Sequence, residues 1–180
     1  MIFDSRQRIL EQRKLWREQG KTVVFTNGCY DILHAGHTRL LEQARSLGDV
    51  LILALNTDAS VARIKGPSRP ILSQSQRGAL AAQLEAVDAV TFFDEDTPTE
   101  LIAALLPDIL VKGADWTHYI AGKEEVEAAG GRVMTIPLEA GFSTSNVVAD
   151  ALASEQGLAF GHATGPQLDD ASPVVRVSTK

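Results

Sequence analysis

The sequence predicts an α/β protein with a doubly wound, five-stranded parallel sheet and helices on both faces. Short apolar runs without charges recur along the chain, as strands buried on both faces require. Segments with apolar residues at helical spacing separate these runs. An alternation of this kind over five rounds is typical of parallel sheets with right-handed crossover connections.

The first half of the chain contains two predicted strands. Residues 4–19 form a charged amphipathic segment, which we expect to be a helix on the outside of the domain, ended by Gly20. Strands are predicted at 23–25 and 50–55, and a helix from about residue 37 to 47 lies between them. Asp58 is expected to cap a short helix that runs to about Ile64. Residues 65–70 contain two prolines and a glycine, so a mobile basic loop is predicted there.

The second half contains the other three predicted strands, at 88–93, 108–111 and 132–136. Two capping boxes are predicted, at Ser73 with Gln76 and at residues 97–100, and they open helices to about residues 85 and 106. Helices are also expected at 119–129 and from about 146 to 152. The predicted organisation is an N-terminal helix packed on the domain (1–20), one domain (21–153) and a flexible, non-periodic C-terminal tail (154–180).

Composition excludes several classes of protein. The net charge of −6 argues against a nucleic-acid-binding surface. The single cysteine excludes a disulfide framework, and no apolar run reaches the ~20 residues that span a bilayer. The N-terminus does not resemble a signal peptide. We therefore expect a cytoplasmic protein that binds small molecules and neither nucleic acid nor membrane; homodimerisation is left open.

Polar residues are concentrated where this fold places ligands, beyond the carboxyl ends of the strands. Candidate groups follow four of the predicted strands: His34 and His37, Asn56 and Asp58, Lys112 and Asp115, and the run 143–146. The two histidines are three residues apart beside a helix N-terminus, a position that favours anions. A structural histidine and a zinc pair are the alternatives, although no third zinc ligand has obvious spacing.

Two motifs resemble a known superfamily. The run His34-Ala35-Gly36-His37, after a strand and Asn27-Gly28-Cys29-Tyr30-Asp31, resembles the HxGH nucleotidyltransferases, and residues 141–145 are similar to the Ser/Thr motif of cytidylyltransferase-like members. Residues 26–37, 56–61, 84–88 and 106–113 are most similar to the adenylyltransferase domain of bacterial ADP-heptose synthase. Tyr30 stands where that group has Phe, and Asp115-Trp116 is more similar to a glycerol-phosphate cytidylyltransferase. The resemblance implies a Rossmann-like fold.

The residues and the resemblance together give a set of candidate site residues. The catalytic candidates, which would hold the triphosphate and stabilise the transition state, are His34, His37 and Lys65. The nucleotide-binding candidates are Thr26, Asn27, Gly28, Cys29, Gly36, Asn56, Asp58, Arg69, Lys112, Gly113, Asp115, Ser143, Thr144 and Ser145. The acceptor-binding candidates are Asp31, Tyr30 and Arg77. Mg²⁺ is expected as a bridge between phosphates, at a position that the sequence does not locate.

The resemblance implies an adenylyltransferase that transfers AMP from ATP to heptose 1-phosphate, giving ADP-heptose and pyrophosphate, in lipopolysaccharide or other cell-surface heptose synthesis. Two alternatives stay open. One is a cytidylyltransferase that acts on an alcohol or sugar phosphate, which Asp115-Trp116 and the Ser/Thr motif favour. The other is a non-catalytic nucleotide-binding domain, which would not require both histidines and the basic loop.

Overall fold

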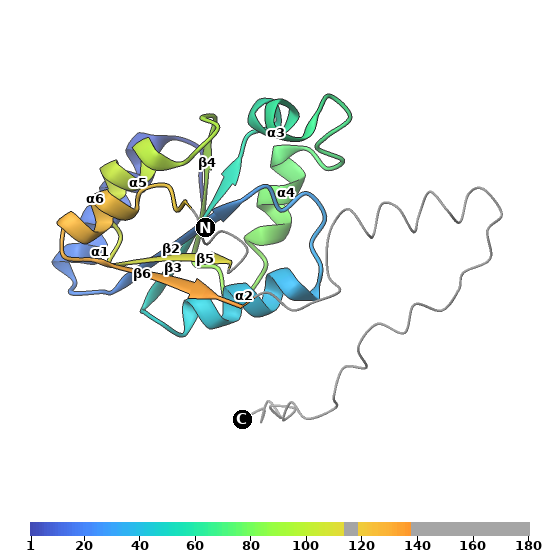
Figure 1. Cartoon of the computed structure of the whole chain (residues 1–180). Helices are drawn as coiled ribbons and strands as arrows, with labels where there is room; N and C mark the ends of the chain where they lie inside the picture. The colour runs from blue at the N-terminus through green and yellow to red at the C-terminus, as the bar shows by residue number, and fades with distance from the viewer. Residues whose placement is uncertain (114–118, 138–180) are drawn as a thin grey trace, which may run out of the picture. The chain divides into compact units, whose positions relative to one another are not determined.

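A six-stranded parallel sheet, in the order β1–β4–β3–β2–β5–β6, forms the centre of the structure (Figure 1). The structure is a computed structural model that describes residues 1–113 and 119–137, all of which belong to one compact unit. The strands are β1 (Ile2–Phe3), β2 (Val23–Gly28), β3 (Val50–Asn56), β4 (Ala89–Phe93), β5 (Ile109–Gly113) and β6 (Arg132–Ile136). The five predicted strands and the doubly wound arrangement are confirmed.

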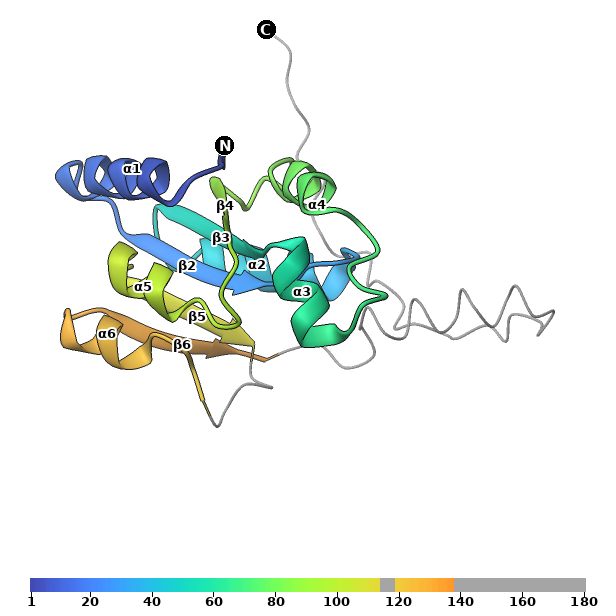
Figure 2. The same cartoon turned by 90° about the horizontal axis from the view of Figure 1, so that it is seen from above.

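Helices cover both faces of this sheet (Figures 1 and 2). One hydrophobic cluster joins the sheet to α1 (Arg6–Glu18), α5 (Thr99–Leu105) and α6 (Lys123–Ala128). The other cluster joins the opposite face to α2 (Ala35–Arg45) and α4 (Gln74–Ala81). The strand β3 is buried along its whole length and sends alternate side chains into the two clusters. The remaining helix, α3 (Asp58–Lys65), follows β3 directly.

The sixth strand, β1, is a correction to the predicted count of five. It pairs with the outer side of β4, where Ile2 lies opposite Val90. The N-terminal ammonium group donates a hydrogen bond to the carbonyl of Asp88 at 2.8 Å. A strand of two residues is too short to show an alternating pattern, so the sequence did not reveal it. Helix α1 begins only after this strand, at a cap provided by the side chain of Ser5.

The ends of the helices agree only in part with the predicted caps. The predicted capping box of Ser73 and Gln76 is confirmed in both directions. The second predicted box is wrong: Pro98 is the N-cap of α5 and makes no side-chain cap hydrogen bond. Asp58 is not a cap either, because the side chain of Thr57 caps α3 and Asp58 lies in its first turn. The helices α4 and α6 are shorter than predicted.

Three aspartates fix the amino-terminal edge of the sheet. Asp49, Asp88 and Asp108 each stand directly before a strand, and each carboxylate accepts a hydrogen bond from a backbone N–H on a neighbouring strand or the segment leading into it. The donors are Thr22 at 2.8 Å, Leu51 at 2.8 Å and Val23 at 2.7 Å, respectively. Because a charged acceptor makes a stronger hydrogen bond than a neutral one, these contacts hold neighbouring strands in register.

The buried guanidinium of Arg13 connects α1 to this edge. It donates to the carbonyls of Leu105 at 3.3 Å and Leu106 at 2.9 Å, and it forms an ion pair with Asp108 at 3.1 Å. Leu106 has a left-handed backbone conformation, with φ of 44°, at the end of α5. Arg13 therefore satisfies carbonyl groups that a helix end would otherwise leave unpaired.

Within residues 1–113 and 119–137, no helix has the length and apolar character that crossing a lipid bilayer requires.

We predict that Gly122→Ala destabilises the fold. Gly122 has φ of +79°, and a Cβ there would lie 2.4 Å from Cγ2 of the fully buried Ile102. We expect the free energy of unfolding, measured by urea denaturation, to fall by about 2–4 kcal/mol. Gly130→Ala is the matched control, because its φ is +83° with nothing within 4 Å, and it should cost about 1 kcal/mol. Equal losses in the two variants would contradict the packing argument.

Candidate active site

A cavity of about 420 Å³ opens at the carboxyl ends of the strands. Its lining comes from the ends of β2, β3 and β5, from α2 and α3, and from the loop between β4 and α5. Eleven of the predicted site residues line it: Thr26, Asn27, Gly28, Cys29, Tyr30, Asp31, His37, Asn56, Lys65, Lys112 and Gly113. The cavity lies where β2 stands between β3 and β5, which is the point at which the strand order reverses.

The two histidines of the motif stack on each other at the start of α2. His34 is the N-cap residue, and its backbone carbonyl accepts a hydrogen bond from the N–H of His37 at 2.9 Å. The ring centroids are 3.7 Å apart with an interplanar angle of 20°. Burial lowers the pKa of His34, and burial together with His34 and Lys65 lowers the pKa of His37 to about 4. Both imidazoles are therefore uncharged at neutral pH and can donate N–H hydrogen bonds to a phosphate oxygen.

Two lysines supply positive charge to the cavity. Lys65 is exposed at the C-terminal end of α3, although the sequence placed it in the following loop. Lys112 lies at the end of β5, and its ammonium group donates to the side-chain oxygen of Asn27 at the end of β2. Of the two histidines, only His37 lines the cavity, and His34 stacks behind it. Two cations and a neutral imidazole around one cavity form a site suited to an anionic ligand with several phosphates.

Asn56 and Cys29 are packed together at the ends of neighbouring strands. The Asn56 side chain donates to Oγ of Ser60 at 3.0 Å, and its oxygen lies 3.7 Å from the Cys29 sulfur. Burial, the dominant effect, raises the pKa of the Cys29 thiol. A protonated thiol is a poor nucleophile, so this burial disfavours covalent catalysis by Cys29.

Asp31, predicted to bind the acceptor, lines the cavity, and protein groups already hold its carboxylate. Its carboxylate is 1% exposed, and it accepts hydrogen bonds from the backbone N–H groups of Ile71 at 2.7 Å and Leu72 at 3.1 Å. It also pairs with Arg69 at 3.2 Å. Arg69 was predicted to bind the nucleotide; its guanidinium is instead directed to Asp31, and Arg69 does not line the cavity. The loop of residues 65–70, which was predicted to be mobile, is thus tied to the loop that follows β2.

Arg77 was predicted to bind the acceptor, and the structure buries its side chain among protein groups. It is 1% exposed. Its guanidinium donates to the carbonyls of Cys29 at 2.7 Å and Leu72 at 3.0 Å, and to the carboxylate of Asp58 at 2.8 Å. Asp58, predicted to bind nucleotide, therefore serves as the counter-ion of Arg77 and does not line the cavity. Arg77 joins three chain segments beneath the site.

Tyr30 was also predicted to bind the acceptor, but only 8% of its surface is exposed. Its ring packs against the imidazole of His37, with centroids 4.6 Å apart. Burial raises the pKa of its hydroxyl far above the ordinary value, against an opposing hydrogen-bonding interaction with Thr26. The ring of Tyr30 therefore contacts the imidazole of His37, a catalytic candidate, directly.

Some cavity residues were missed by the sequence analysis. They are Leu40, Ile64, Asp96, Thr97, Pro98, Tyr119 and Ala121. Three of these follow β4, and the polar run 94–97 at the carboxyl end of a strand is the signal that could have found them. Gly36 lies inside α2 and does not line the cavity. The predictions at Asp115, Ser143, Thr144 and Ser145, and for the tail 154–180, lie outside the described residues.

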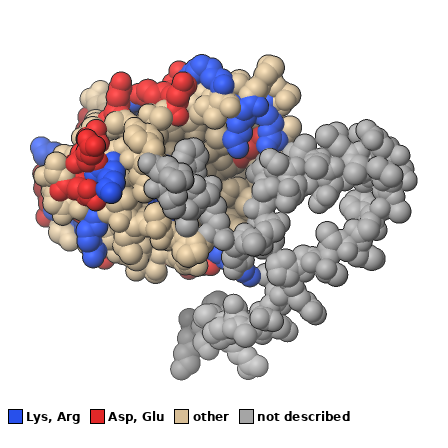
Figure 3. Space-filling view, in the orientation of Figure 1, with Lys and Arg blue, Asp and Glu red and all other residues tan. Residues whose placement is uncertain are grey.

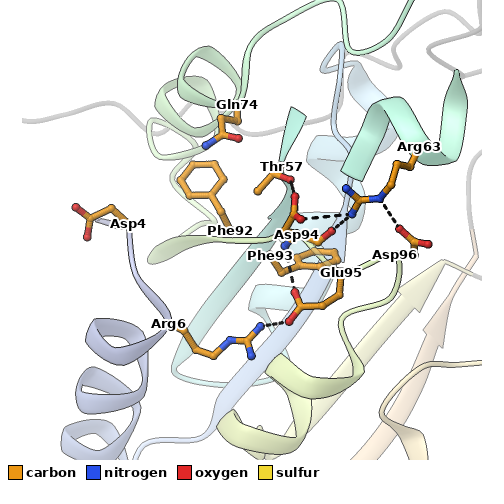
Figure 4. A pocket seen from close by; sticks show the side chains of 10 residues that line it. All are labelled: Asp4, Arg6, Thr57, Arg63, Gln74, Phe92, Phe93, Asp94, Glu95 and Asp96. Carbon is orange, nitrogen blue, oxygen red and sulfur yellow. Dashed lines mark hydrogen bonds and ion pairs between the residues drawn. The ribbon is translucent and has the colours of Figure 1, made fainter. Parts of the chain in front are cut away.

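A larger hollow of about 800 Å³ lies beyond the other side of α3. Figure 4 shows Arg63 of α3 in this hollow, directed at Asp94 and Asp96, and Arg6 of α1 directed at Glu95. Arg63 pairs with Asp96 at 3.0 Å and with Asp94 at 3.6 Å. These carboxylates are already paired with arginines, so we assign the hollow a structural role: it anchors the helix that carries Lys65.

The surface near this hollow carries both signs of charge. In Figure 3, acidic side chains gather near β4 and α5, and basic side chains gather near α3 along the same upper edge. The side-chain exposures of Arg63, Asp94 and Asp96 are 46%, 63% and 69%. Solvent screens ion pairs this exposed, so they contribute little to the stability of the fold. Their main effect is to orient α3.

The family is decided by residues 25–150, which match the model of the cytidylyltransferase-like family. This chain belongs to the cytidylyltransferase-like family. It is therefore a nucleotidyltransferase, and the match includes the histidine pair, Lys65 and Lys112. The family model reaches from β2 past the end of β6, and so covers every strand that contributes to the cavity.

Curated relatives support this placement. The bifunctional protein HldE of Syntrophotalea carbinolica is 52% identical over 151 residues, which cover 81% of this chain and 31% of that protein. The HldE of Trichlorobacter lovleyi is 56% identical over 133 residues, covering 73% of this chain and 27% of that protein. This cytidylyltransferase-like chain thus spans less than a third of the length of these relatives.

Solved structures show the same fold. The lipopolysaccharide core biosynthesis protein of Thermoplasma volcanium has a TM-score of 0.55 and 29% identity, covering 67% of this chain and 98% of that one. The pantoate-beta-alanine ligase of Francisella tularensis has a TM-score of 0.63 and 16% identity, covering 87% of this chain and 77% of that one. The second similarity shows the fold alone.

We predict that Arg77→Met lowers the free energy of unfolding by about 3–5 kcal/mol, because it leaves the Asp58 carboxylate and two carbonyl groups without their buried donor. Chemical denaturation monitored by circular dichroism measures this. Arg63→Met is the matched control, since its ion pairs are exposed, and its effect should be much smaller. A loss in Arg77→Met no larger than that of the control would show that the buried contacts contribute little.

Proposed function

We propose that this chain transfers AMP from ATP to heptose 1-phosphate, giving ADP-heptose and pyrophosphate. The observation that carries the proposal is the uncharged His37 at the N-terminus of α2, stacked on His34, with Lys65 and Lys112 lining the same cavity as His37. Membership in the nucleotidyltransferase family supports the reaction type. The similarity to HldE proteins and to a lipopolysaccharide core biosynthesis protein supports the acceptor.

The reaction requires alignment more than proton transfer. A phosphate oxygen of the sugar 1-phosphate forms a bond to the α-phosphorus of ATP, and the bond from that phosphorus to the oxygen that leads to the β-phosphate breaks. The electron pair leaves with pyrophosphate. Because the attacking oxygen is already anionic at neutral pH, no strong base is needed, and the enzyme acts by positioning the two substrates and stabilising charge.

Four side chains would position the substrates and stabilise the developing charge. In the proposal, His34 and His37 donate hydrogen bonds to phosphate oxygens of the nucleotide, where negative charge builds in the transition state. The ammonium group of Lys65 approaches the leaving phosphates from α3. Lys112, fixed by Asn27, lies at the end of β5, on the opposite side of β2 from β3, and approaches the nucleotide from there. Donors held in place before the substrate binds need no rearrangement during the reaction.

Mg²⁺ stays an expectation in this proposal. Among residues 1–113 and 119–137, no group of three His, Cys, Asp or Glu side chains could hold a metal ion. The best-placed carboxylate, that of Asp31, is occupied by Ile71, Leu72 and Arg69. The described residues therefore offer no site of three such ligands, and Mg²⁺ would be held largely by the phosphates of the substrate. The roles given above belong to the side chains themselves.

The test is pyrophosphate release from ATP or CTP with heptose 1-phosphate, other sugar phosphates and glycerol phosphate. We expect release with ATP and heptose 1-phosphate. His37→Ala should lower kcat about 100-fold or more, as loss of a donor to transition-state charge does, while the free energy of unfolding changes little. Lys65→Met should also lower kcat. Lys14→Met, an exposed lysine on α1, is the matched control and should retain activity.

Other outcomes of this assay would redirect the proposal. Release with CTP in place of ATP would make the chain a cytidylyltransferase. Release from no pair of substrates would favour a nucleotide-binding domain without catalytic activity. Near-normal turnover in His37→Ala would contradict the role of the histidine pair.

A further inference from the structure

The imidazole of His37 lies between two other rings. His34 stacks on it with a centroid distance of 3.7 Å, and the ring of Tyr30 packs against it at 4.6 Å with an interplanar angle of 40°. Nδ1 of His37 is buried and has no hydrogen-bond partner among the described residues. The orientation of this ring therefore depends on the two rings that contact it, because no hydrogen bond at Nδ1 holds it.

The position of the Tyr30 ring follows from an unusual backbone conformation. Tyr30 has φ of 47°, in the left-handed region that residues other than glycine rarely adopt. The ring lies directly over Gly28: a Cβ on Gly28 would be 2.9 Å from Cε2 of Tyr30. Gly28, predicted to bind the nucleotide, lines the cavity, and its lack of a side chain also makes room for the aromatic ring.

Hydrogen bonds fix the residues on both sides of Tyr30. The carbonyl of Cys29 accepts a hydrogen bond from the buried guanidinium of Arg77 at 2.7 Å. The carboxylate of Asp31 is held by the N–H groups of Ile71 and Leu72. A strained backbone conformation persists only where its surroundings determine it, and such residues are concentrated at functional sites. Contacts from Ile71, Leu72 and Arg77, which are 40 to 48 positions away from their partners in the sequence, thus place one ring against His37.

We propose that Tyr30 is a positioning residue for the reaction: its ring fixes the orientation of the His37 imidazole and shields that imidazole from water until a triphosphate arrives. The expected effect of Tyr30 on kcat rests on the proposed function. Its expected effect on the packing and pKa of His37 does not. Tyr30 thereby has a role other than acceptor binding, since its ring acts through His37.

The charge state of His37 follows from the same packing. Burial is the largest cause that lowers its pKa, and the groups that act with it are His34 on α2 and Lys65 on α3. If the Tyr30 ring is removed, water reaches the imidazole and its pKa rises toward the ordinary value of about 6.5. Part of the free enzyme would then carry a protonated His37 near neutral pH, where the unmodified protein keeps it uncharged.

Two substitutions separate the ring from the backbone. Tyr30→Phe keeps the ring. Tyr30→Asn removes the ring but keeps a residue that tolerates the left-handed conformation, so the loop is not strained further. The first readout is the pKa of His37 in the free protein, from NMR titration of its imidazole signals, assigned with His37→Gln. We expect a value near 4 in the unmodified protein and in Tyr30→Phe, and a rise of at least about one pH unit in Tyr30→Asn.

The second readout is the steady-state rate with ATP and heptose 1-phosphate. Tyr30→Phe should keep kcat within about threefold, and Tyr30→Asn should lower kcat about tenfold or more with a smaller change in KM for ATP, because orientation of the donor matters most in the transition state. Gly28→Ala, which displaces the ring without removing it, should shift the His37 pKa in the same direction as Tyr30→Asn. It provides the test if the Asn variant does not fold.

The two proposals fail in different ways. An unchanged His37 pKa in Tyr30→Asn and Gly28→Ala would overturn the role of Tyr30, whatever the enzyme catalyses. An equal loss of kcat in Tyr30→Phe and Tyr30→Asn would also overturn it, since the hydroxyl would then be the active part. If the pKa pattern holds but the unmodified protein releases no pyrophosphate, the proposed function fails and the positioning of His37 by Tyr30 stands.

Discussion

The location of the site depends on one constraint, the place of β2 between β3 and β5 in an all-parallel sheet. After β2 the chain passes through α2 to β3 and then forms β4 on the same side of β2. It returns to the other side of β2 only at β5. The loops that leave β2 and β5 therefore diverge, and a cavity remains between them at the carboxyl edge. The carboxyl ends of β2, β3 and β5 reach this cavity directly, and α2 and α3 present His37 and Lys65 to it.

A second layer of buried polar contacts supports the residues that face the cavity. Arg77 and Asp31 hold the loop that follows β2 in the conformation that places Tyr30 against His37. On the far side of α3, Arg63 orients the helix that ends in Lys65. The site thus separates two tasks: a neutral imidazole and two cations line the cavity, while ion pairs and hydrogen bonds behind them hold the supporting segments in place. Such preorganisation is what a reaction governed by alignment requires.

The sequence predicted the sheet well because apolar periodicity is a local property. It predicted the site partly, because strand ends and the histidine motif indicate where polar groups collect, and His37, Lys65 and Lys112 do meet at one cavity. It could not show which charges pair with each other. Arg69 and Asp31 are 38 positions apart in the printed numbering, and their pairing depends on the path of a loop that local patterns do not determine. The two-residue strand β1 was missed for a related reason: its pairing with β4 is tertiary.

The most direct test of the account is a crystal structure of the chain with α,β-methylene ATP, an analogue that cannot transfer its α-phosphorus, and Mg²⁺. We expect the triphosphate in the cavity beside β2, within hydrogen-bonding distance of the His34 and His37 imidazoles and close to the Lys65 ammonium group. A nucleotide bound in the hollow around Arg63, or bound in the cavity with its phosphates directed away from both histidines, would contradict the account.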